Sequence, residues 1–164
     1  MCIRDRTWID LESYALGSLV TFSLYDSVGR TRPSYTDCQH DHTLQDECGV
    51  SPTVSFPSGH AAEAFMSAGL SCAKHAYVPI YGSRVLDALA CARDLTLASA
   101  DGVLRIMGDR HYATDVLAGG ALGFAFGFGL PVLLHYGSHG EDHAGLVLAP
   151  QVGSRSGIVA TGAF

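Results

Sequence analysis

Hydrophobic and polar residues follow each other along this chain in a pattern that predicts helices. Apolar residues recur at helical spacing from Trp8 to about Ser27, and Gly29 with Pro33 ends that stretch. No strand pattern is strong enough to interrupt the helical periodicity, so we expect an all-α fold, a helical bundle. Three further helices are expected, over about Ser58–His75, Arg84–Met107 and His111–Tyr136.

The segment from Arg30 to Pro57 is polar and rich in Asp, His, Ser and Pro. It is longer than most connections within compact domains, and loops of this length are usually functional or disordered. We therefore expect a loop here, and a functional site at the helix ends and this intervening loop.

The last predicted helix contains a stretch suited to a membrane. From Val116 to Leu134 there are nineteen consecutive uncharged residues, close to the length that spans a bilayer. The five glycines in this stretch would allow close helix packing in lipid, and Pro131 is expected to bend the helix.

The third predicted helix carries charges at regular spacing. Asp87, Asp94 and Asp101 recur every seven residues and share one face, with Arg105 one turn further on. Charges at membrane depth are costly unless they face a bundle interior or a wet cavity. Two interpretations stay open: the row lines the bundle interior and leads to the site, or it is the solvated face of a soluble helix.

The two ends of the chain differ from its helical part. Residues 1–6 lack the pattern of a signal peptide and resemble translated adaptor sequence, so they are interpreted as a non-native leader. Residues 7–136 are expected to form one helical domain that is incomplete at its N-terminus. Residues 137–164 contain Gly, Ser and His and are expected to form a flexible tail.

The composition places the chain between a soluble helical domain and a small membrane protein. Of the 164 residues, 48% are hydrophobic and only 16% are charged, and the mean hydropathy is slightly positive. The formal net charge of -6 leaves no basic surface to meet a phosphate backbone, which argues against a nucleic-acid partner.

Four cysteines remain when Cys2 is assigned to the leader, and none has the CxxC spacing of a zinc site. An even number allows two disulfides, which would imply an oxidising compartment. Cys38 and Cys48 bracket one polar segment and form the better candidate pair. Cys72 and Cys91 lie in consecutive helices and fit buried thiols about equally well.

A short motif, Pro57-Ser58-Gly59-His60, lies where the polar segment meets the second helix. A helix start offers free backbone N–H groups and the positive end of the helix dipole, which suit an anion. Gly59 lets the backbone approach a ligand, Ser58 adds a hydroxyl donor, and His60 can reach a bound phosphate.

A second motif contains Arg105, His111 and Asp115. Because His111 and Asp115 are four residues apart, Asp115 is expected to accept a hydrogen bond from one ring nitrogen and leave the other as a nucleophile. Gly108 breaks the helix, so the chain can fold back and place the Arg105 guanidinium, which matches phosphate oxygens, beside His111. Alone, such a His–Asp pair is more often a surface hydrogen bond.

Arg30 and Arg32 form a third element, just past the end of the first helix. Standing alone, they would be interpreted as ordinary partners of the helix dipole. Together the three elements resemble the type 2 phosphatidic acid phosphatase superfamily, whose signatures are Lys-x6-Arg-Pro, Pro-Ser-Gly-His and Ser-Arg-x5-His-x3-Asp. The second signature is complete here, Leu104 replaces the Ser of the third, and Tyr25 stands where the first has Lys.

The resemblance implies a role for each matching residue. His111 would attack phosphorus to give a phosphohistidine, Asp115 would orient His111, and His60 would protonate the departing alkoxide. The groups implied to bind phosphate oxygens are Arg32, Arg105, Ser58 and the Gly59 amide, with Arg30 as a substitute for the missing Lys. No metal or other cofactor is expected.

The function expected from this resemblance is hydrolysis of a phosphate monoester: a lipid phosphate, an isoprenoid phosphate or another organic phosphate. The expected location is the cell membrane, with the site facing the periplasm or the exterior. Two alternatives stay open. One is a vanadium-dependent haloperoxidase-like enzyme in which His111 binds vanadium, and the other is a catalytically weak phosphate-binding membrane module.

Overall fold

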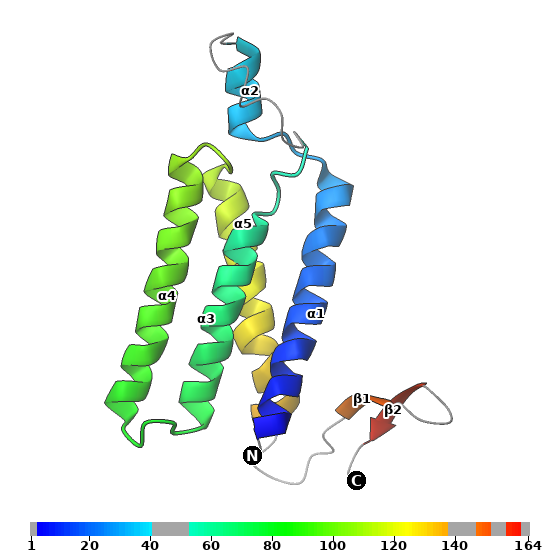
Figure 1. The fold of residues 1–164 in the computed structure, drawn as a ribbon, viewed down its shortest axis with the longest axis vertical. Coiled ribbons are helices and arrows are strands. Elements are labelled where there is room, and N and C mark those ends of the chain that lie inside the picture. Colours follow the sequence, from blue (N-terminus) through cyan, green and yellow to red (C-terminus); the bar gives the residue numbers. More distant parts are fainter. Residues whose placement is uncertain (1–2, 41–52, 138–146, 152–156, 162–164) are drawn as a thin grey trace.

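The computed structural model describes residues 3–40, 53–137, 147–151 and 157–161 (Figure 1). The helices are α1 (Ile3–Val28), α2 (Pro33–His40), α3 (Gly59–Tyr77), α4 (Arg84–Met107) and α5 (Ala113–Phe124), which continues through η2 (Ala125–Gly129) and η3 (Val132–Tyr136). Two short strands, β1 (Val147–Gln151) and β2 (Gly157–Thr161), pair antiparallel. The predicted all-α bundle is confirmed.

The helix α3 occupies the centre of the bundle. It packs against α1, α4 and the continuous helix formed by α5 and η2. In Figure 1 it lies between α4 and α1, with the α5 helix behind it. Small residues suit this position because they let several helices approach one another closely. The buried small residues of α3 include Ala61, Ala62, Ala68, Gly69 and Ala73.

A row of glycines brings α5 directly against the backbone of α3. A side chain at Gly119 would collide with the backbone of Ser58, and one at Gly123 with the backbone of Ala62. Gly127 repeats this contact one turn further on. The close packing expected from the glycines is therefore present. It fixes the start of α5 against the start of α3.

The helix from Ala113 to Tyr136 runs past Pro131 through widened turns. The N–H of Leu130 bonds the carbonyl of Ala125, and the N–H of Gly137 bonds that of Val132, each five residues back. Because proline has no N–H to donate, such adjustments let a helix continue beyond it. Within the described part of the chain, this helix alone has the length and apolarity to cross a membrane.

Two elements lie where the sequence pattern did not predict them. The helix α2 occupies part of the segment that was expected to be one loop. Pro33 begins it, and proline suits the first helical position because the N–H there needs no partner within the helix. The pair of β1 and β2 lies inside the segment expected to be a flexible tail. Strands of five residues carry too few positions for a clear alternating pattern.

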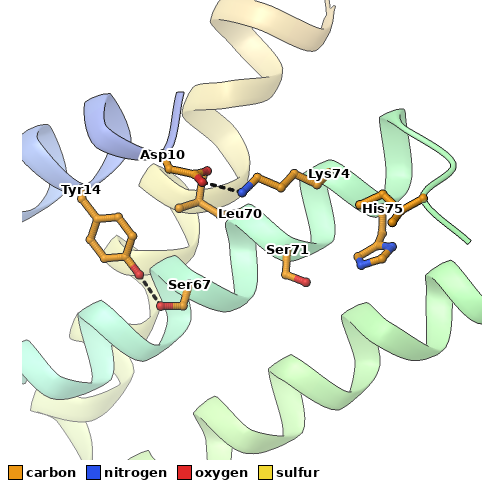
Figure 2. Close-up of a pocket in the computed structure, with 8 residues that line it drawn as sticks. Asp10, Tyr14, Ser67, Leu70, Ser71, Lys74 and His75 are labelled. Carbon is orange, nitrogen blue, oxygen red and sulfur yellow. Dashed lines mark hydrogen bonds and ion pairs between the residues drawn. The ribbon is translucent and has the colours of Figure 1, made fainter. Parts of the chain in front are cut away.

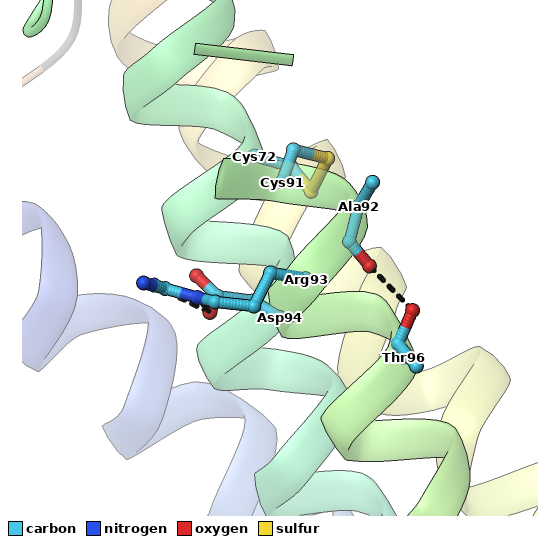
Figure 3. The surroundings of a disulfide bond; sticks show 6 residues. All are labelled: Cys72, Cys91, Ala92, Arg93, Asp94 and Thr96. Atoms are coloured by element: carbon cyan, nitrogen blue, oxygen red, sulfur yellow. Dashed lines mark hydrogen bonds and ion pairs between the residues drawn. A yellow bond between two sulfur atoms is a disulfide. The ribbon is translucent and has the colours of Figure 1, made fainter. Parts of the chain in front are cut away.

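A disulfide joins Cys72 of α3 to Cys91 of α4 (Figure 3). The sequence had left this pair undecided between a disulfide and two buried thiols. Cys38 is disulfide-bonded as well. Cys48, its expected partner, lies outside the described residues.

The first aspartate of the row in α4 faces α3. Asp87 is buried, and its carboxylate lies 2.6 Å from Nδ1 of His75. Asp94 and Asp101 are half-buried and form ion pairs with Arg93 and Arg105 of their own helix. The interior interpretation therefore holds for Asp87, and the row as a whole is not a buried face.

Candidate active site

The residues of the three sequence motifs lie at one end of the bundle. This end gathers the last turns of α1 and α4 and the first turns of α2, α3 and α5 (Figure 1). Backbone hydrogen bonds fasten these segments together. They run from Ser34 N–H to the Asp109 carbonyl (3.0 Å), from Ser55 N–H to the Arg30 carbonyl (2.9 Å) and from Ser58 N–H to the Asp115 carbonyl (2.9 Å).

The first turn of α3 holds Ser58 and His60 in different surroundings. Ser58 is fully buried, and its hydroxyl oxygen accepts a hydrogen bond from the N–H of Ala61 at 3.4 Å, which caps the helix. The hydrogen of this hydroxyl remains a donor. The side chain of His60 is exposed. It is therefore accessible to a substrate and to water.

The ring of His111 is buried and held through one nitrogen. Its Nδ1 lies 2.8 Å from the carbonyl oxygen of Ser55. A carbonyl only accepts hydrogen bonds, so Nδ1 carries the proton and Nε2 keeps the lone pair. We had expected Asp115 to accept this bond. The structure gives His111 a backbone partner instead, because Ser55 lies between the two side chains.

Burial lowers the pKa of His111 below its ordinary value. The hydrogen bond to Ser55 opposes this shift, whereas Arg32 and His60 lower the pKa further. The imidazole is therefore neutral at neutral pH, as a nucleophile must be.

Asp115 forms the centre of a buried hydrogen-bond network. One carboxylate oxygen lies 2.7 Å from an Arg30 guanidinium nitrogen. The other accepts from the Ser55 hydroxyl at 2.6 Å and from the Tyr112 N–H at 3.0 Å. Arg30 also bonds the hydroxyl of Thr114 and stacks on the Tyr112 ring. Arg30 is therefore engaged with Asp115, which does not support its expected role as a substitute phosphate ligand.

Ser55 belongs to the site although no sequence motif predicts it. Its N–H, its carbonyl and its hydroxyl connect Arg30, His111 and Asp115, respectively. Two of these three groups belong to the backbone, and every residue type except proline has them. The identity of the residue at position 55 therefore could not predict these two hydrogen bonds. The position of Ser55 two residues before the Pro57-Ser58-Gly59-His60 motif was the available sign.

Arg32 and Arg105 differ in their surroundings. The Nε atom of Arg32 is buried and has no hydrogen-bond partner among the described residues. Arg105 is half-exposed, and its Nε lies 3.4 Å from the carboxylate of Asp101, one turn earlier in α4. The Arg105 carbonyl accepts from the N–H of His111 at 3.4 Å. The chain thus folds back as expected, while the Arg105 guanidinium contacts Asp101.

Gly59 is in contact with Tyr25, in the last part of α1. A side chain at Gly59 would meet the Tyr25 hydroxyl, so the tyrosine would have to move to admit one. Burial raises the pKa of Tyr25 above its ordinary value, and the phenol is therefore uncharged at neutral pH.

A cavity lies away from these residues, between α1 and α3 (Figure 2). It has a volume of about 260 Å³, and an ion pair between Lys74 and Asp10 (2.6 Å) lies along its wall. Fourteen residues of helix separate His60 from Lys74, which corresponds to about 21 Å. The described residues contain no cluster of three His, Cys, Asp or Glu side chains placed to hold a metal ion.

Comparison with known protein families identifies the family of this chain. The family model of the PAP2 superfamily matches residues 6–138. The chain belongs to the PAP2 superfamily. Among curated proteins it is similar to a lipid A 1-phosphatase of Porphyromonas gingivalis, with 35% identity over 112 residues. That match covers 68% of this chain but only 20% of the relative. No solved structure matches.

Proposed function

We propose that this PAP2 chain hydrolyses phosphate monoesters and that His111 carries the reaction through a phosphohistidine. The observation that supports this most is the contact between His111 Nδ1 and the Ser55 carbonyl. It directs the lone pair to Nε2 without using Asp115, while burial keeps the ring neutral by lowering its pKa. A buried, oriented and neutral imidazole is what an attacking nitrogen requires.

The reaction has two steps. In the first, Nε2 of His111 forms a bond to phosphorus as the ester P–O bond breaks, and His60 gives a proton to the departing alkoxide. In the second, a water molecule attacks the phosphohistidine, the P–N bond breaks, and His60 takes the proton from the water. Phosphate leaves and His60 is again protonated.

Arg32 is the cation that we favour for binding the phosphate, because its Nε is buried and lacks a partner among the described residues, and its charge lowers the pKa of His111. The Ser58 hydroxyl supplies a further donor. Arg105 joins these groups when its guanidinium turns from Asp101 towards His111. Asp115 and Arg30 act as positioning residues, since they hold Ser55 and through it the His111 ring.

A lipid phosphate is the substrate class that we favour. The similar Porphyromonas gingivalis protein is named a lipid A 1-phosphatase. Large apolar side chains are exposed along α4, among them Leu89, Leu97 and Leu104 at 59%, 63% and 64%. Such a surface fits contact with lipid or with further helices. The candidate site at the start of α5 then lies at one end of the membrane span, where a lipid head group is accessible.

We further propose that this end faces the periplasm or the exterior. The helix α2 lies beside the site and carries Cys38, which is disulfide-bonded. Disulfides persist in oxidising compartments, which favours the outer side of the membrane. Labelling of a cysteine introduced at exposed Thr53 by a membrane-impermeant maleimide tests this orientation. Labelling only after the cells are permeabilised would contradict it.

The experiment for the mechanism combines turnover with trapping of the intermediate. The purified chain in detergent is given phosphatidic acid, an isoprenyl phosphate and a lipid A phosphate, each labelled with ³²P. Acid-labile, base-stable protein label should form in the wild type and be absent in His111→Ala. The exchange His135→Asn, in η3 at the opposite end of the bundle, serves as a matched control. Wild-type turnover by His111→Ala would refute the proposal, as would halide oxidation that depends on added vanadate in place of phosphatase activity.

A further inference from the structure

Arg30 holds Ser55 from two sides. The backbone carbonyl of Arg30 accepts the Ser55 N–H at 2.9 Å, and its guanidinium donates to Oδ1 of Asp115 at 2.7 Å. The other Asp115 oxygen accepts the Ser55 hydroxyl at 2.6 Å. These three residues therefore form a closed ring of hydrogen bonds. The remaining polar group of Ser55, its carbonyl, lies 2.8 Å from Nδ1 of His111.

The closed ring depends on a guanidinium that is partly open to water. Two hydrogen bonds of the Arg30 side chain leave from the same nitrogen, Nη1, and reach Asp115 at 2.7 Å and the hydroxyl of Thr114 at 2.8 Å. Because the Arg30 side chain is 38% exposed, water competes for both bonds. Contacts that cover the guanidinium therefore determine how firmly Ser55 is held.

Tyr112 provides such a contact. The central carbon of the Arg30 guanidinium lies 4.2 Å from the centre of the half-buried Tyr112 ring, which covers one face of the cation. Tyr112 directly follows His111, and its N–H donates to Asp115 at 3.0 Å. The same residue thus holds the guanidinium with its ring and the carboxylate with its backbone.

The proton of the His111 ring depends on this assembly. While the Ser55 carbonyl stays in place, the proton is on Nδ1 and the lone pair is on Nε2. If Ser55 moves, His111 loses its partner and the proton exchanges between the two ring nitrogens. The form with the proton on Nε2 has no lone pair there and cannot attack phosphorus from this nitrogen.

We propose that Tyr112 and Thr114 are positioning residues for the reaction. They hold the Arg30 guanidinium on Asp115, and Ser55 then keeps the proton of His111 on Nδ1. This inference rests on the proposed function, because it takes Nε2 of His111 as the attacking nitrogen. It assigns Arg30 to the nucleophile and not to the phosphate, so loss of this hold should lower kcat and leave KM unchanged.

The ring nitrogens of His111 report the position of the proton without any substrate. In the intact chain in detergent, labelled with ¹⁵N at histidine, NMR separates a protonated ring nitrogen from an unprotonated one at pH 7.5. The signals that disappear in His111→Gln belong to His111. In the wild type, Nδ1 should carry the proton.

Paired variants separate the ring and the hydroxyl from the rest of each side chain. Tyr112→Leu removes the ring, and it should bring the two nitrogen signals of His111 towards each other and lower kcat by about threefold to tenfold. Tyr112→Phe keeps the ring and should match the wild type. Thr114→Val removes an exposed hydrogen bond and should lower kcat by about twofold, whereas Thr114→Ser should match the wild type. In an Arg30→Met background, Tyr112→Leu should have no further effect, because the ring then has no cation to hold.

Tyr77→Leu is the matched control. Tyr77 is exposed at the opposite end of the bundle, and its ring stacks on Tyr136. This variant should lose stability while the His111 signals and kcat stay unchanged. Wild-type His111 signals and kcat in Tyr112→Leu would overturn the inference. So would a Tyr112→Phe variant as impaired as Tyr112→Leu, or an effect confined to KM, which would make Arg30 a phosphate ligand.

The two proposals fail in different ways. If the His111 signals respond to Tyr112→Leu but no phosphohistidine forms in the wild type, the proposed mechanism fails, while the hold of Tyr112 on the His111 proton stands. If the phosphohistidine forms but neither the signals nor kcat respond to Tyr112→Leu, the inference fails alone.

Discussion

Nδ1 of His111 lies 2.8 Å from the carbonyl oxygen of Ser55, and these residues are 56 positions apart in the chain. The same Ser55 donates its hydroxyl to Asp115 at 2.6 Å. The imidazole and the carboxylate are thus connected through one serine and do not bond each other. Five predictions follow from this arrangement and from the packing that supports it.

Ser55→Ala keeps the carbonyl that holds His111 and removes the hydroxyl that Asp115 accepts. Because the lost hydrogen bond is buried and involves a charged group, we expect a loss of about 2 kcal/mol in the free energy of unfolding. Denaturant unfolding measures this value. Ser27→Ala removes an exposed hydroxyl bond to the Ser23 carbonyl and should cost less than about 0.5 kcal/mol. Equal losses in the two variants would contradict the central role of Ser55.

Arg30→Ala removes the partner of the fully buried Asp115 carboxylate. Since the Arg30 side chain is 38% exposed, water screens the pair in part, and we expect a loss of about 1–3 kcal/mol. Arg93→Ala breaks an exposed ion pair with Asp94 of similar length and should cost less than about 1 kcal/mol. If Asp115→Asn does not reduce the effect of Arg30→Ala in a double-mutant cycle, the two residues are not coupled.

The lowered pKa of His111 has a defined effect on the dependence of stability on pH. Above the unfolded value of about 6.5, the ring is neutral in both states and contributes no pH dependence. Below it, the unfolded chain binds the proton first, so stability falls with pH until the folded pKa is passed. His111→Gln should remove this part of the acid-induced loss. Denaturant unfolding of both proteins between pH 7.5 and 5 provides the measurement.

The same shift predicts the acidic limit of activity. Because the folded pKa of His111 is lowered, the nucleophile stays neutral as the pH falls below 6.5. The acidic limb of kcat/KM should therefore lie below pH 6.5. An NMR titration of the His111 ring in the folded chain gives an independent value. A ring pKa above 6.5 would contradict the burial argument.

Gly119→Ala introduces a methyl group into the backbone of Ser58. Because backbone atoms cannot move aside easily, we expect a loss of about 1–3 kcal/mol and a drop in activity, since the start of α5 moves against the start of α3. Gly129→Ala, in the same helix, meets nothing within 4 Å and should be neutral or slightly stabilising. Thermal unfolding and phosphatase assays of both variants test this difference. A Gly119→Ala variant as stable and active as Gly129→Ala would sink the packing argument.

The sequence by itself determined the helical bundle, its long apolar helix and its membership in the PAP2 superfamily. These follow from local patterns: periodicity, glycine spacing, and short motifs such as Pro57-Ser58-Gly59-His60. The motifs also named His111 and His60, which the structure places at the same end of the bundle. Residue types and spacings were sufficient to predict these features, because each depends on residues at consecutive or regularly spaced positions.

Only the tertiary structure decided which group each site residue contacts. His111 bonds a backbone carbonyl, Arg30 pairs with Asp115, and the Tyr25 hydroxyl lies against Gly59. The physical reason is that a backbone carbonyl or amide is present at every position and leaves no trace in the sequence. Its partner depends on where the loop before α3 lies against α5, and the packing of Gly119 on Ser58 fixes that placement.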